Sequence, residues 1–391
     1  MKILLIDPIG TGHHLEYVSL LSEGLKSFGH QVYFFGAPSL LDTLVSDSLI
    51  QDGISYNFSE PSQASAYFKT ESARIRFCRQ AISNSFKINA DVCHFLYMDH
   101  FIISAVCSGV LKDKSLAVCV TLHWLYFLPD FSPTRAHKLK GSIDLMALRL
   151  LASRGMRVMI HSEKSVASLN NKFIGAQQFD YVPYPVKMRK ITDDEKASIR
   201  IRLRARLGLA SQDVLLLVFG TTRCDKGADI AIKMLAHLPQ RYHLLFAGED
   251  TFFSQSYLAG LASEQGFLKR VHFDNRLIPE DEIPTYFCGC DIVLIPYRKN
   301  FAGQSGPLTI AAAFGIKVVA PNLPVLAETV LKNDLGYLYP VENVELMADA
   351  VQKAINAPAP KYFEKFIDEH CTLVFTDAVT ASYSKAISQQ K

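Results

Sequence analysis

Two basic side chains, Arg223 and Lys226, follow a predicted buried strand and have the types and spacing to bind a diphosphate. The strand reads VLLLVFG at residues 214–220, and the loop after it reads TTRCDKG. A guanidinium group offers a fork of N–H donors and an ammonium group offers a compact charge, so the pair suits a pyrophosphate. The alternative interpretation is a solvated basic turn.

A second candidate anion site lies at the start of a predicted helix. The run IVLIP at residues 292–296 is typical of a buried strand, and a polar loop containing Gly303 and Gly306 follows it. Pro307 suits the first helical position because it has no N–H to leave unpaired. The helix is expected to stop at Gly315, and free N–H groups at its start would bind phosphate.

The two loops are expected to be neighbours. Each follows a strand of one predicted parallel sheet, and such loops meet at the carboxyl edge of the sheet. Ser305 and Gly306 would then lie beside Arg223 and Lys226. Two adjacent anion sites are a stronger signal than either alone, which weakens the interpretation of a solvated turn.

The first half of the chain begins as a Rossmann-like unit. A strand at 2–7 runs into the loop PIGTG, a helix follows from His13, and a second strand spans 31–35. A dinucleotide site would need a third glycine at Leu15 and an acid after the second strand. The strand ends in Phe35, Gly36 and Ala37 instead, which disfavours NAD.

Histidines near predicted strand ends are the other candidates. His123 follows a strand at 116–121, and residues just beyond strand ends face the ligand cleft of an open α/β sheet. Capping or packing is the alternative for His123, and it is the favoured interpretation of Asp99 and His100. The pair His13 and His14 has no third ligand at a useful spacing, so a metal site is not expected.

The length of 391 residues predicts two domains. In the first, strands at 91–97, 157–161 and 181–185 would complete a sheet of about six strands. A capped helix from Thr192 to Gly208 follows, and its four arginines favour a solvated linker face over nucleic-acid binding. A second Rossmann-like unit begins at Asp213.

Composition indicates an ordinary soluble protein, with 49% hydrophobic and 20% charged residues. The uncharged apolar run at 101–111 is too short to span a bilayer, and Met1 to Asp7 reaches an acid too soon for a signal peptide. We therefore expect a cytoplasmic enzyme. The eight cysteines show no CxxC spacing and are expected to be reduced core residues.

Charge is distributed unevenly along the chain. Residues 1–190 carry 20 Lys and Arg against 15 Asp and Glu, whereas residues 191–391 carry 21 against 23. The excess is concentrated in residues 135–190, with 11 bases and 3 acids. This local excess favours contact with an anionic surface or acceptor, such as acidic lipid head groups, or else forms a solvated basic face.

These motifs together resemble the GT-B glycosyltransferases of family 4, the retaining, nucleotide-sugar-dependent group 1 enzymes. The resemblance is carried by FGTTRCDKG, HFDNRLIPEDEIPTYFCGCDIVLIPYR, SGPLTIAAAFGIKVVA, LAETV, GYLYP and the N-terminal IGTGHHLEY. It extends over essentially the whole chain and is more specific in the second half.

The family implies an α/β fold, GT-B, in which two Rossmann-like domains with parallel sheets face each other across a cleft. Residues 1–188 would bind the acceptor, 189–209 would be the linker, and 210–372 would bind the nucleotide sugar. Residues 373–391 would form a C-terminal helix that packs back on the first domain.

The resemblance also assigns roles to single residues. Arg223 and Lys226 match the basic pair on the donor diphosphate, and His123 matches the histidine that contacts the donor sugar, so these three are the expected catalytic residues. The expected donor-binding residues are Gly12, Gly220, Ser305, Gly306, Pro307, Leu308 and Glu328.

One departure from the family concerns its E-x7-E motif. Ala302 and Ile310 stand where the family has the two glutamates. Ile310 cannot accept a hydrogen bond from a ribose hydroxyl. Glu328 matches a downstream family acid and could compensate, and a surface helix position is the alternative for it.

The implied reaction moves a sugar from a nucleotide-diphosphate sugar to a saccharide or lipid-linked acceptor, as in polysaccharide biosynthesis. Arg223 and Lys226 would stabilise the leaving diphosphate. No cofactor or metal is expected, because these cations are present and no loop carries Asp-x-Asp spacing. Retention could proceed on one face, with the leaving phosphate taking the acceptor proton and no protein base required.

Two rival functions are considered. The sequence GQSGP at 303–307 resembles a hydrolase nucleophile elbow, but Pro307 replaces the required glycine and no strand feeds directly into the turn. A catalytically inactive GT-B protein that binds or regulates a partner is the second rival, because Ala302 and Ile310 lack the family acids.

Overall fold

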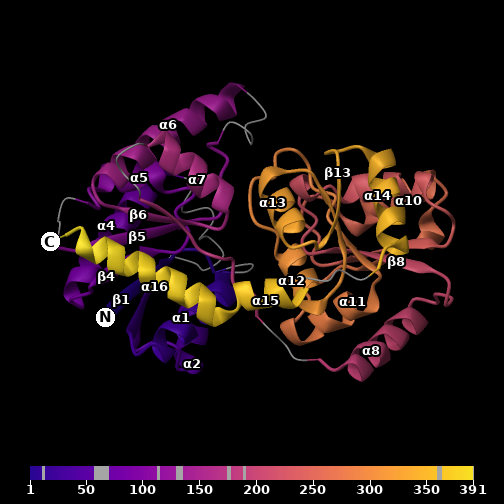
Figure 1. Cartoon of the computed structure of the whole chain (residues 1–391), viewed down its shortest axis with the longest axis horizontal. Coiled ribbons are helices and arrows are strands. Elements are labelled where there is room, and N and C mark those ends of the chain that lie inside the picture. Colours follow the sequence, from indigo (N-terminus) through magenta and orange to yellow (C-terminus); the bar gives the residue numbers. More distant parts are fainter. Residues whose placement is uncertain are drawn as a thin grey trace. The chain divides into compact units, whose positions relative to one another are not determined.

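The computed structural model describes residues 1–10, 14–56, 70–111, 115–128, 135–173, 178–187, 191–358 and 363–390, and of residues 135–138 the backbone alone. Contacts divide the chain into two compact units (Figure 1). Unit 1 comprises Met1–Lys187 with Glu369–Lys391, and unit 2 comprises Met188–Asp368.

Unit 1 contains a seven-stranded parallel sheet with the order β3-β2-β1-β4-β5-β6-β7. The strands are β1 (Lys2–Asp7), β2 (Gln31–Gly36), β3 (Asp52–Ser55), β4 (Val92–Phe95), β5 (Ala117–Leu122), β6 (Arg157–Ile160) and β7 (Phe179–Tyr181). The central strands are fully buried, as their apolar runs predict.

The helices of unit 1 pack on this sheet and on one another. They are α1 (His14–Ser27), α2 (Pro38–Ser46), α4 (Glu71–Lys87), α5 (Ile102–Ser108), α6 (Arg135–Ser153), α7 (Glu163–Lys172) and α16 (Thr372–Ser388). Helix α16, yellow in Figure 1, contacts α1 as well as strands β5 and β6. Its side chains Phe375, Val379 and Tyr383 join the same apolar core as Tyr17 and Leu21.

Unit 2 contains a six-stranded parallel sheet with the order β10-β9-β8-β11-β12-β13. The strands are β8 (Val214–Phe219), β9 (Tyr242–Ala247), β10 (Val271–Asp274), β11 (Ile292–Leu294), β12 (Val318–Pro321) and β13 (Gly336–Tyr339). The helices are α8 (Asp193–Arg206), α9 (Ala228–Met234), α10 (Gln255–Glu264), α11 (Ile283–Gly289), α12 (Gly306–Phe314), α13 (Pro324–Lys332) and α14 (Val344–Asn356). Helix α15 (Phe363–His370) runs across the boundary between the units.

The expectation of two Rossmann-like domains is confirmed, whereas the estimate of six strands in the first sheet is wrong. Strand β3 was missed because it has only four residues, DGIS, and lies at the sheet edge with alternate exposure. The strand predicted at 181–185 lies at Phe179–Tyr181. Short edge strands carry little apolar sequence signal.

Helix α8 begins as predicted but differs from a solvated linker. Thr192 and Glu195 form a capping box, in which the Thr192 side chain accepts from the Glu195 N–H and Glu195 accepts from the Thr192 N–H. Its arginines, however, are not all solvated. Arg204 is 8% exposed, and both Arg200 and Arg204 pair with Asp291. Helix α8 is therefore part of unit 2.

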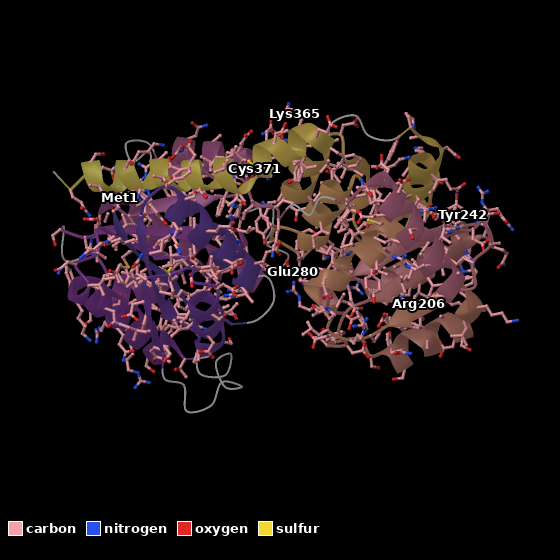
Figure 2. The ribbon with its side chains drawn as sticks, turned by 90° about the horizontal axis from the view of Figure 1, so that it is seen from below. Met1, Arg206, Tyr242, Glu280, Lys365 and Cys371 are labelled. Atoms are coloured by element: carbon pink, nitrogen blue, oxygen red, sulfur yellow. The ribbon has the colours of Figure 1, made fainter. Side chains whose placement is uncertain are left out.

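Side chains fill both units (Figure 2). Arg206, the last residue of α8 and labelled in Figure 2, has its Nη2 3.7 Å from an oxygen of Asp274. All eight cysteines are free, but Cys107 and Cys224 are exposed, so the expectation of core positions is wrong for those two.

Within the described residues, no helix has the length and apolar character needed to cross a bilayer.

Candidate functional site

The loop after β8 carries the predicted basic pair. Gly220 directly follows β8 and has a φ of +99°, a conformation that side-chain-bearing residues rarely adopt. The chain then turns through a short 3-10 helix at Cys224–Lys226. The Arg223 guanidinium donates two hydrogen bonds to the Asp225 carboxylate, with Nη2–Oδ2 2.7 Å and Nε–Oδ1 3.0 Å, and its side chain stays 41% exposed.

Lys226 is half-buried and its ammonium group forms no hydrogen bond or ion pair with the described residues. Nζ lies 2.8 Å from the place where a Cβ on Gly220 would stand, so the absence of a side chain there makes room for it. Burial lowers the pKa of Lys226 to about 8, and the neighbouring charge of Arg223 acts in the same direction. An anion beside Lys226 would remove this electrostatic penalty.

The loop after β11 is fixed against the loop after β8. The Arg298 N–H donates to the Asp225 carbonyl at 2.8 Å, and the Arg298 guanidinium donates to the Cys224 carbonyl at 2.9 Å and to both oxygens of Asp229 at 2.7 Å. A Cβ on Gly227 would stand 2.1 Å from the Pro296 carbonyl oxygen, so the two backbones are in close contact. The expected adjacency of the two loops is therefore present in unit 2.

Ser305 caps helix α12. Its hydroxyl accepts from the Leu308 N–H at 3.3 Å and lies 3.1 Å from the Tyr297 hydroxyl. Burial raises the pKa of Tyr297 to about 12, although the hydrogen bond with Ser305 opposes this shift. Pro307 has no N–H, and the Gly306 N–H has no acceptor among the described residues. The amide of Gly306 is thus available to an anion at the helix start.

The sequence singled out four further positions in unit 2. Leu308 is 1% exposed and packs in the core, so its backbone rather than its side chain shapes the helix start. Glu328 is half-buried on α13, the helix that follows the neighbouring strand β12. Ala302 is buried, and Ile310 is half-buried on α12.

His123 lies in unit 1, just beyond β5, and is 6% exposed. Its Nε2–H donates to the Leu96 carbonyl at 3.0 Å. The Tyr97 ring is stacked between two imidazoles, with centroids 3.9 Å from His123 and 3.6 Å from His14. His123 is therefore held in one orientation by its neighbours. Gly12, like His13, falls outside the described residues.

Asp99 supports His123 from the loop after β4. One carboxylate oxygen accepts from the N–H groups of His123, at 2.9 Å, and Trp124, at 2.6 Å, which confirms the structural interpretation of Asp99. The other oxygen is buried without a hydrogen-bond partner. Burial raises the pKa of Asp99 to about 7, although the two backbone N–H groups favour the carboxylate.

Two neighbours of these residues were not singled out from the sequence. Asp7 at the end of β1 is fully buried and accepts from Nδ1–H of His14 at 2.8 Å. Tyr297 stands directly after Pro296. The rule that strand-end residues face the ligand would have found both positions, because each follows an apolar strand. Among the described residues, no group of three or more His, Cys, Asp or Glu has the arrangement of a metal site.

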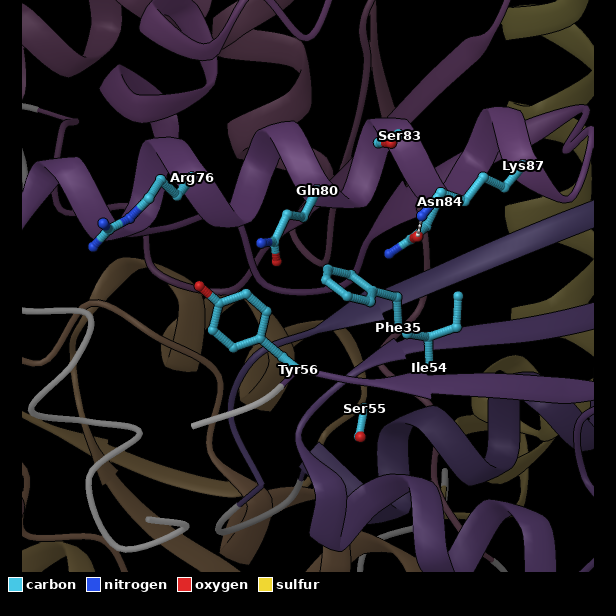
Figure 3. A pocket seen from close by; sticks show the side chains of 9 residues that line it. All are labelled: Phe35, Ile54, Ser55, Tyr56, Arg76, Gln80, Ser83, Asn84 and Lys87. Atoms are coloured by element: carbon cyan, nitrogen blue, oxygen red, sulfur yellow. Dashed lines mark hydrogen bonds between the residues drawn. The ribbon is translucent and has the colours of Figure 1, made fainter. Parts of the chain in front are cut away.

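A polar hollow of about 530 Å³ lies elsewhere in unit 1, between β3 and α4 (Figure 3). Figure 3 shows Gln80 and Asn84 pointing from α4 towards Tyr56 and Phe35. The lining contains bases, amides and hydroxyls but no carboxylate: Phe35, Ile54, Ser55, Tyr56, Arg76, Gln80, Ser83, Asn84 and Lys87. This composition suits a polar or anionic ligand, and none of the predicted site residues contributes to it.

The sequence of unit 2 matches a known family. Residues 213–357 match the family model of glycosyl transferases group 1. The D-inositol 3-phosphate glycosyltransferase of Mycobacterium avium (strain 104) is 30% identical over 203 residues, which cover 48% of this chain and 45% of that protein. The 2-deoxystreptamine glucosyltransferase of Streptomyces kanamyceticus is 26% identical over 230 residues, covering 57% and 56%. The chain thus spans about half the length of the curated relatives it matches.

A solved structure resembles the whole chain. HepE of Anabaena, in complex with UDP and glucose, has a TM-score of 0.71 at 17% identity, covering 98% of this chain and 99% of that one. At this identity the likeness shows the fold. The GT-B fold is therefore confirmed, and the match at 213–357 confirms the resemblance to glycosyl transferases group 1.

Proposed function

We propose that this chain is a retaining glycosyltransferase that moves a sugar from a nucleotide-diphosphate sugar to a saccharide or lipid-linked acceptor. The observation that carries the proposal is the half-buried ammonium of Lys226, which has no partner among the described residues. It stands in the same turn as Arg223, and this turn contacts the loop that leads to α12, whose Gly306 amide is open. A diphosphate supplies the negative charge that this arrangement lacks.

The chemistry follows from where charge develops. When the bond between the anomeric carbon and the phosphate oxygen breaks, the leaving diphosphate gains negative charge. Lys226, Arg223 and the Gly306 N–H would stabilise that charge. These groups supply the electrostatic stabilisation otherwise given by a divalent ion, so we propose a metal-independent reaction without a cofactor.

Retention of configuration would proceed on one face of the sugar. The acceptor oxygen forms its bond to the anomeric carbon as the phosphate leaves, and the acceptor proton passes to the leaving phosphate oxygen. No protein base is then required. His123, fixed by Leu96 and Tyr97, would contact the donor sugar, and the Gly12 loop would approach the diphosphate.

The acceptor is assigned to unit 1 and the nucleotide sugar to unit 2. The polar hollow beside α4 offers the hydroxyl, amide and basic groups that bind a saccharide with an anionic substituent. UDP is bound by HepE, a structure with the same fold, and its presence there supports a nucleotide donor here. We further propose a cytoplasmic enzyme with peripheral membrane contact through unit 1 and without a nucleic-acid partner.

A panel of nucleotide sugars tests the proposal. Binding would be measured by calorimetry, and donor hydrolysis and transfer would be measured with and without EDTA. Arg223→Ala and Lys226→Ala should each lower turnover about 100-fold, in the range seen for lost transition-state donors. Lys233→Ala, which alters an exposed lysine of α9, is the matched control and should leave turnover unchanged.

Each outcome of the panel decides between functions. A strict metal requirement would contradict the metal-independent reaction. Donor binding without any turnover would favour the alternative of an inactive GT-B regulatory protein, which Ala302 and Ile310 make worth testing. Absence of binding to every nucleotide diphosphate would overturn the proposed donor site.

A further inference from the structure

Helix α6 carries an exposed apolar stripe. Leu139, Ile143, Met146 and Leu150 are 67%, 49%, 73% and 38% exposed. Their spacing of four, three and four residues places them on one face of the helix. Apolar side chains that are exposed singly are ordinary, but a continuous stripe of four on one helix marks an interaction surface.

The opposite face of α6 already anchors the helix to unit 1. Leu148, Leu151 and Ala152 are buried, and a Cβ on Gly141 would stand 3.0 Å from the Phe127 backbone. Helix α6 also packs against α5 (Figure 1). The stripe therefore plays no part in the packing of unit 1, and the helix needs no further contact to be held in place.

The charges on the exposed face all have one sign. Lys140 and Arg149 are exposed, and at 100° per residue they fall on opposite sides of the stripe, each about 90° from its centre. Arg154, just past the helix end, is also exposed. The acid of the helix, Asp144, is 3% exposed and accepts a hydrogen bond from the Tyr126 hydroxyl at 3.0 Å. Among the described residues of α6, no carboxylate accompanies these bases on the exposed face.

We propose that the α6 stripe docks the protein onto the surface of a bilayer with anionic head groups. The four apolar side chains would enter the boundary of the acyl region, while Lys140 and Arg149 reach sideways to lipid phosphates. A second copy of this chain would bring bases against bases. The sequence of residues 135–190 carries 11 bases and 3 acids, and this excess favours an extended anionic surface.

This inference specifies the surface for the proposed membrane contact. It rests on the proposed function only for the purpose of docking, which is access to a lipid-linked acceptor. Docking itself is a binding property and needs no turnover. It can therefore be measured independently of donor chemistry.

Vesicle sedimentation of the full chain is the direct test. The protein should bind vesicles of phosphatidylglycerol with phosphatidylcholine, bind phosphatidylcholine alone more weakly, and dissociate as salt increases. The double variant Leu139→Asp with Met146→Asp should lose affinity at least about tenfold. Lys140→Ala and Arg149→Ala should each lower affinity about fivefold.

Matched controls alter equally exposed apolar side chains in unit 2. Leu277→Asp and Leu331→Asp change residues that are 71% and 66% exposed, and both should bind vesicles as the unaltered protein does. Donor binding in solution should be unchanged in the α6 double variant. Sedimentation equilibrium of the same variants reports on self-association.

Three results would overturn the docking proposal: no binding of the unaltered protein to anionic vesicles, undiminished binding of the double variant, or a dimer that the double variant dissociates. Vesicle binding without any donor binding would instead leave docking in place and contradict the proposed function. Donor turnover without vesicle binding would support the proposed function and contradict docking.

Discussion

The ammonium group of Lys226 lies over Gly220, so that a Cβ at residue 220 would stand 2.8 Å from Nζ. We predict that Gly220→Ala displaces Lys226 and raises the donor dissociation constant. It should also lower the free energy of unfolding by about 1 kcal/mol, because alanine is strained at a φ of +99°. Calorimetric titration and urea unfolding would measure both effects.

The control for this variant is Gly260→Ala. Gly260 lies within α10, and a Cβ there meets nothing within 4 Å. Alanine in a helix interior stabilises by about 0.5–1 kcal/mol relative to glycine, so the control should shift unfolding in the opposite direction and leave donor binding unchanged. Unaltered donor binding in Gly220→Ala would contradict the placement of the diphosphate.

Lys226→Met should make the protein more stable while weakening donor binding and lowering turnover. The pKa of Lys226 is about 8 in the folded chain, below the ordinary value of 10.5, so its charge destabilises the folded state at neutral pH. Removing the charge should raise the free energy of unfolding at pH 7 by about 1–3 kcal/mol. Urea unfolding would measure this gain, and calorimetry would show the loss of donor binding.

The unfolding free energies of the unaltered protein and of Lys226→Met should depend on pH in different ways. The unfolded chain binds more protons than the folded chain between pH 8 and 10.5, so the stability of the unaltered protein rises with pH across that window. The gain from Lys226→Met should shrink there. Donor affinity of the unaltered protein should fall above pH 8 as Lys226 loses its proton. If the gain in unfolding free energy of Lys226→Met did not change with pH, the lowered pKa of Lys226 would be refuted.

Ser305→Ala should separate the cap of α12 from its proposed role as a ligand site. Loss of the hydroxyl that accepts from the Leu308 N–H should lower the free energy of unfolding by about 1 kcal/mol. Asn343→Ala removes the equivalent cap of α14, where Oδ1 accepts from the Leu346 N–H at 2.9 Å, at a similar cost. Only Ser305→Ala should weaken donor binding, measured by calorimetry. Equal donor binding in both variants would show that the α12 start is structural alone.

The fold could be read largely from the sequence because parallel strands are buried on both faces and leave continuous apolar runs, as in Val214–Phe219. The contact between the loops after β8 and β11 followed from the same reasoning, since both loops lie at one sheet edge. The partners of individual side chains could not be predicted from the sequence. Neither the pairing of Arg223 with Asp225 nor the stacking of Tyr97 between His14 and His123 has a sequence periodicity. The first is set by the conformation of a single turn, and the second depends on how three separate segments approach one another.

Asp99→Asn should flatten the pH dependence of stability. Burial raises the pKa of Asp99 to about 7 from the ordinary 3.8, so the folded chain holds a proton that the unfolded chain releases in this window. The stabilisation is present below pH 3.8 and is lost as pH rises through 7. Between pH 5 and 8 the unfolding free energy of the unaltered protein should fall by about 1–3 kcal/mol more than that of Asp99→Asn. Parallel curves from urea unfolding would contradict this view of Asp99.

Asp291→Ala should destabilise unit 2 without affecting donor binding. The Asp291 carboxylate accepts from Arg200, from Arg204 at 3.1 Å and from the Leu215 N–H at 2.8 Å. Its removal leaves the buried Arg204 guanidinium with only carbonyl partners, and we expect a loss of about 3 kcal/mol of unfolding free energy. The control Asp193→Ala, at an exposed pair with Lys196, should cost at most a few tenths of a kcal/mol, since exposed pairs contribute about 0–1 kcal/mol. Equal losses of unfolding free energy in the two variants would contradict this prediction. They would mean that the arginines of α8 do not hold the helix to β11, the strand that leads into the Ser305 loop, and that α8 is a solvated linker.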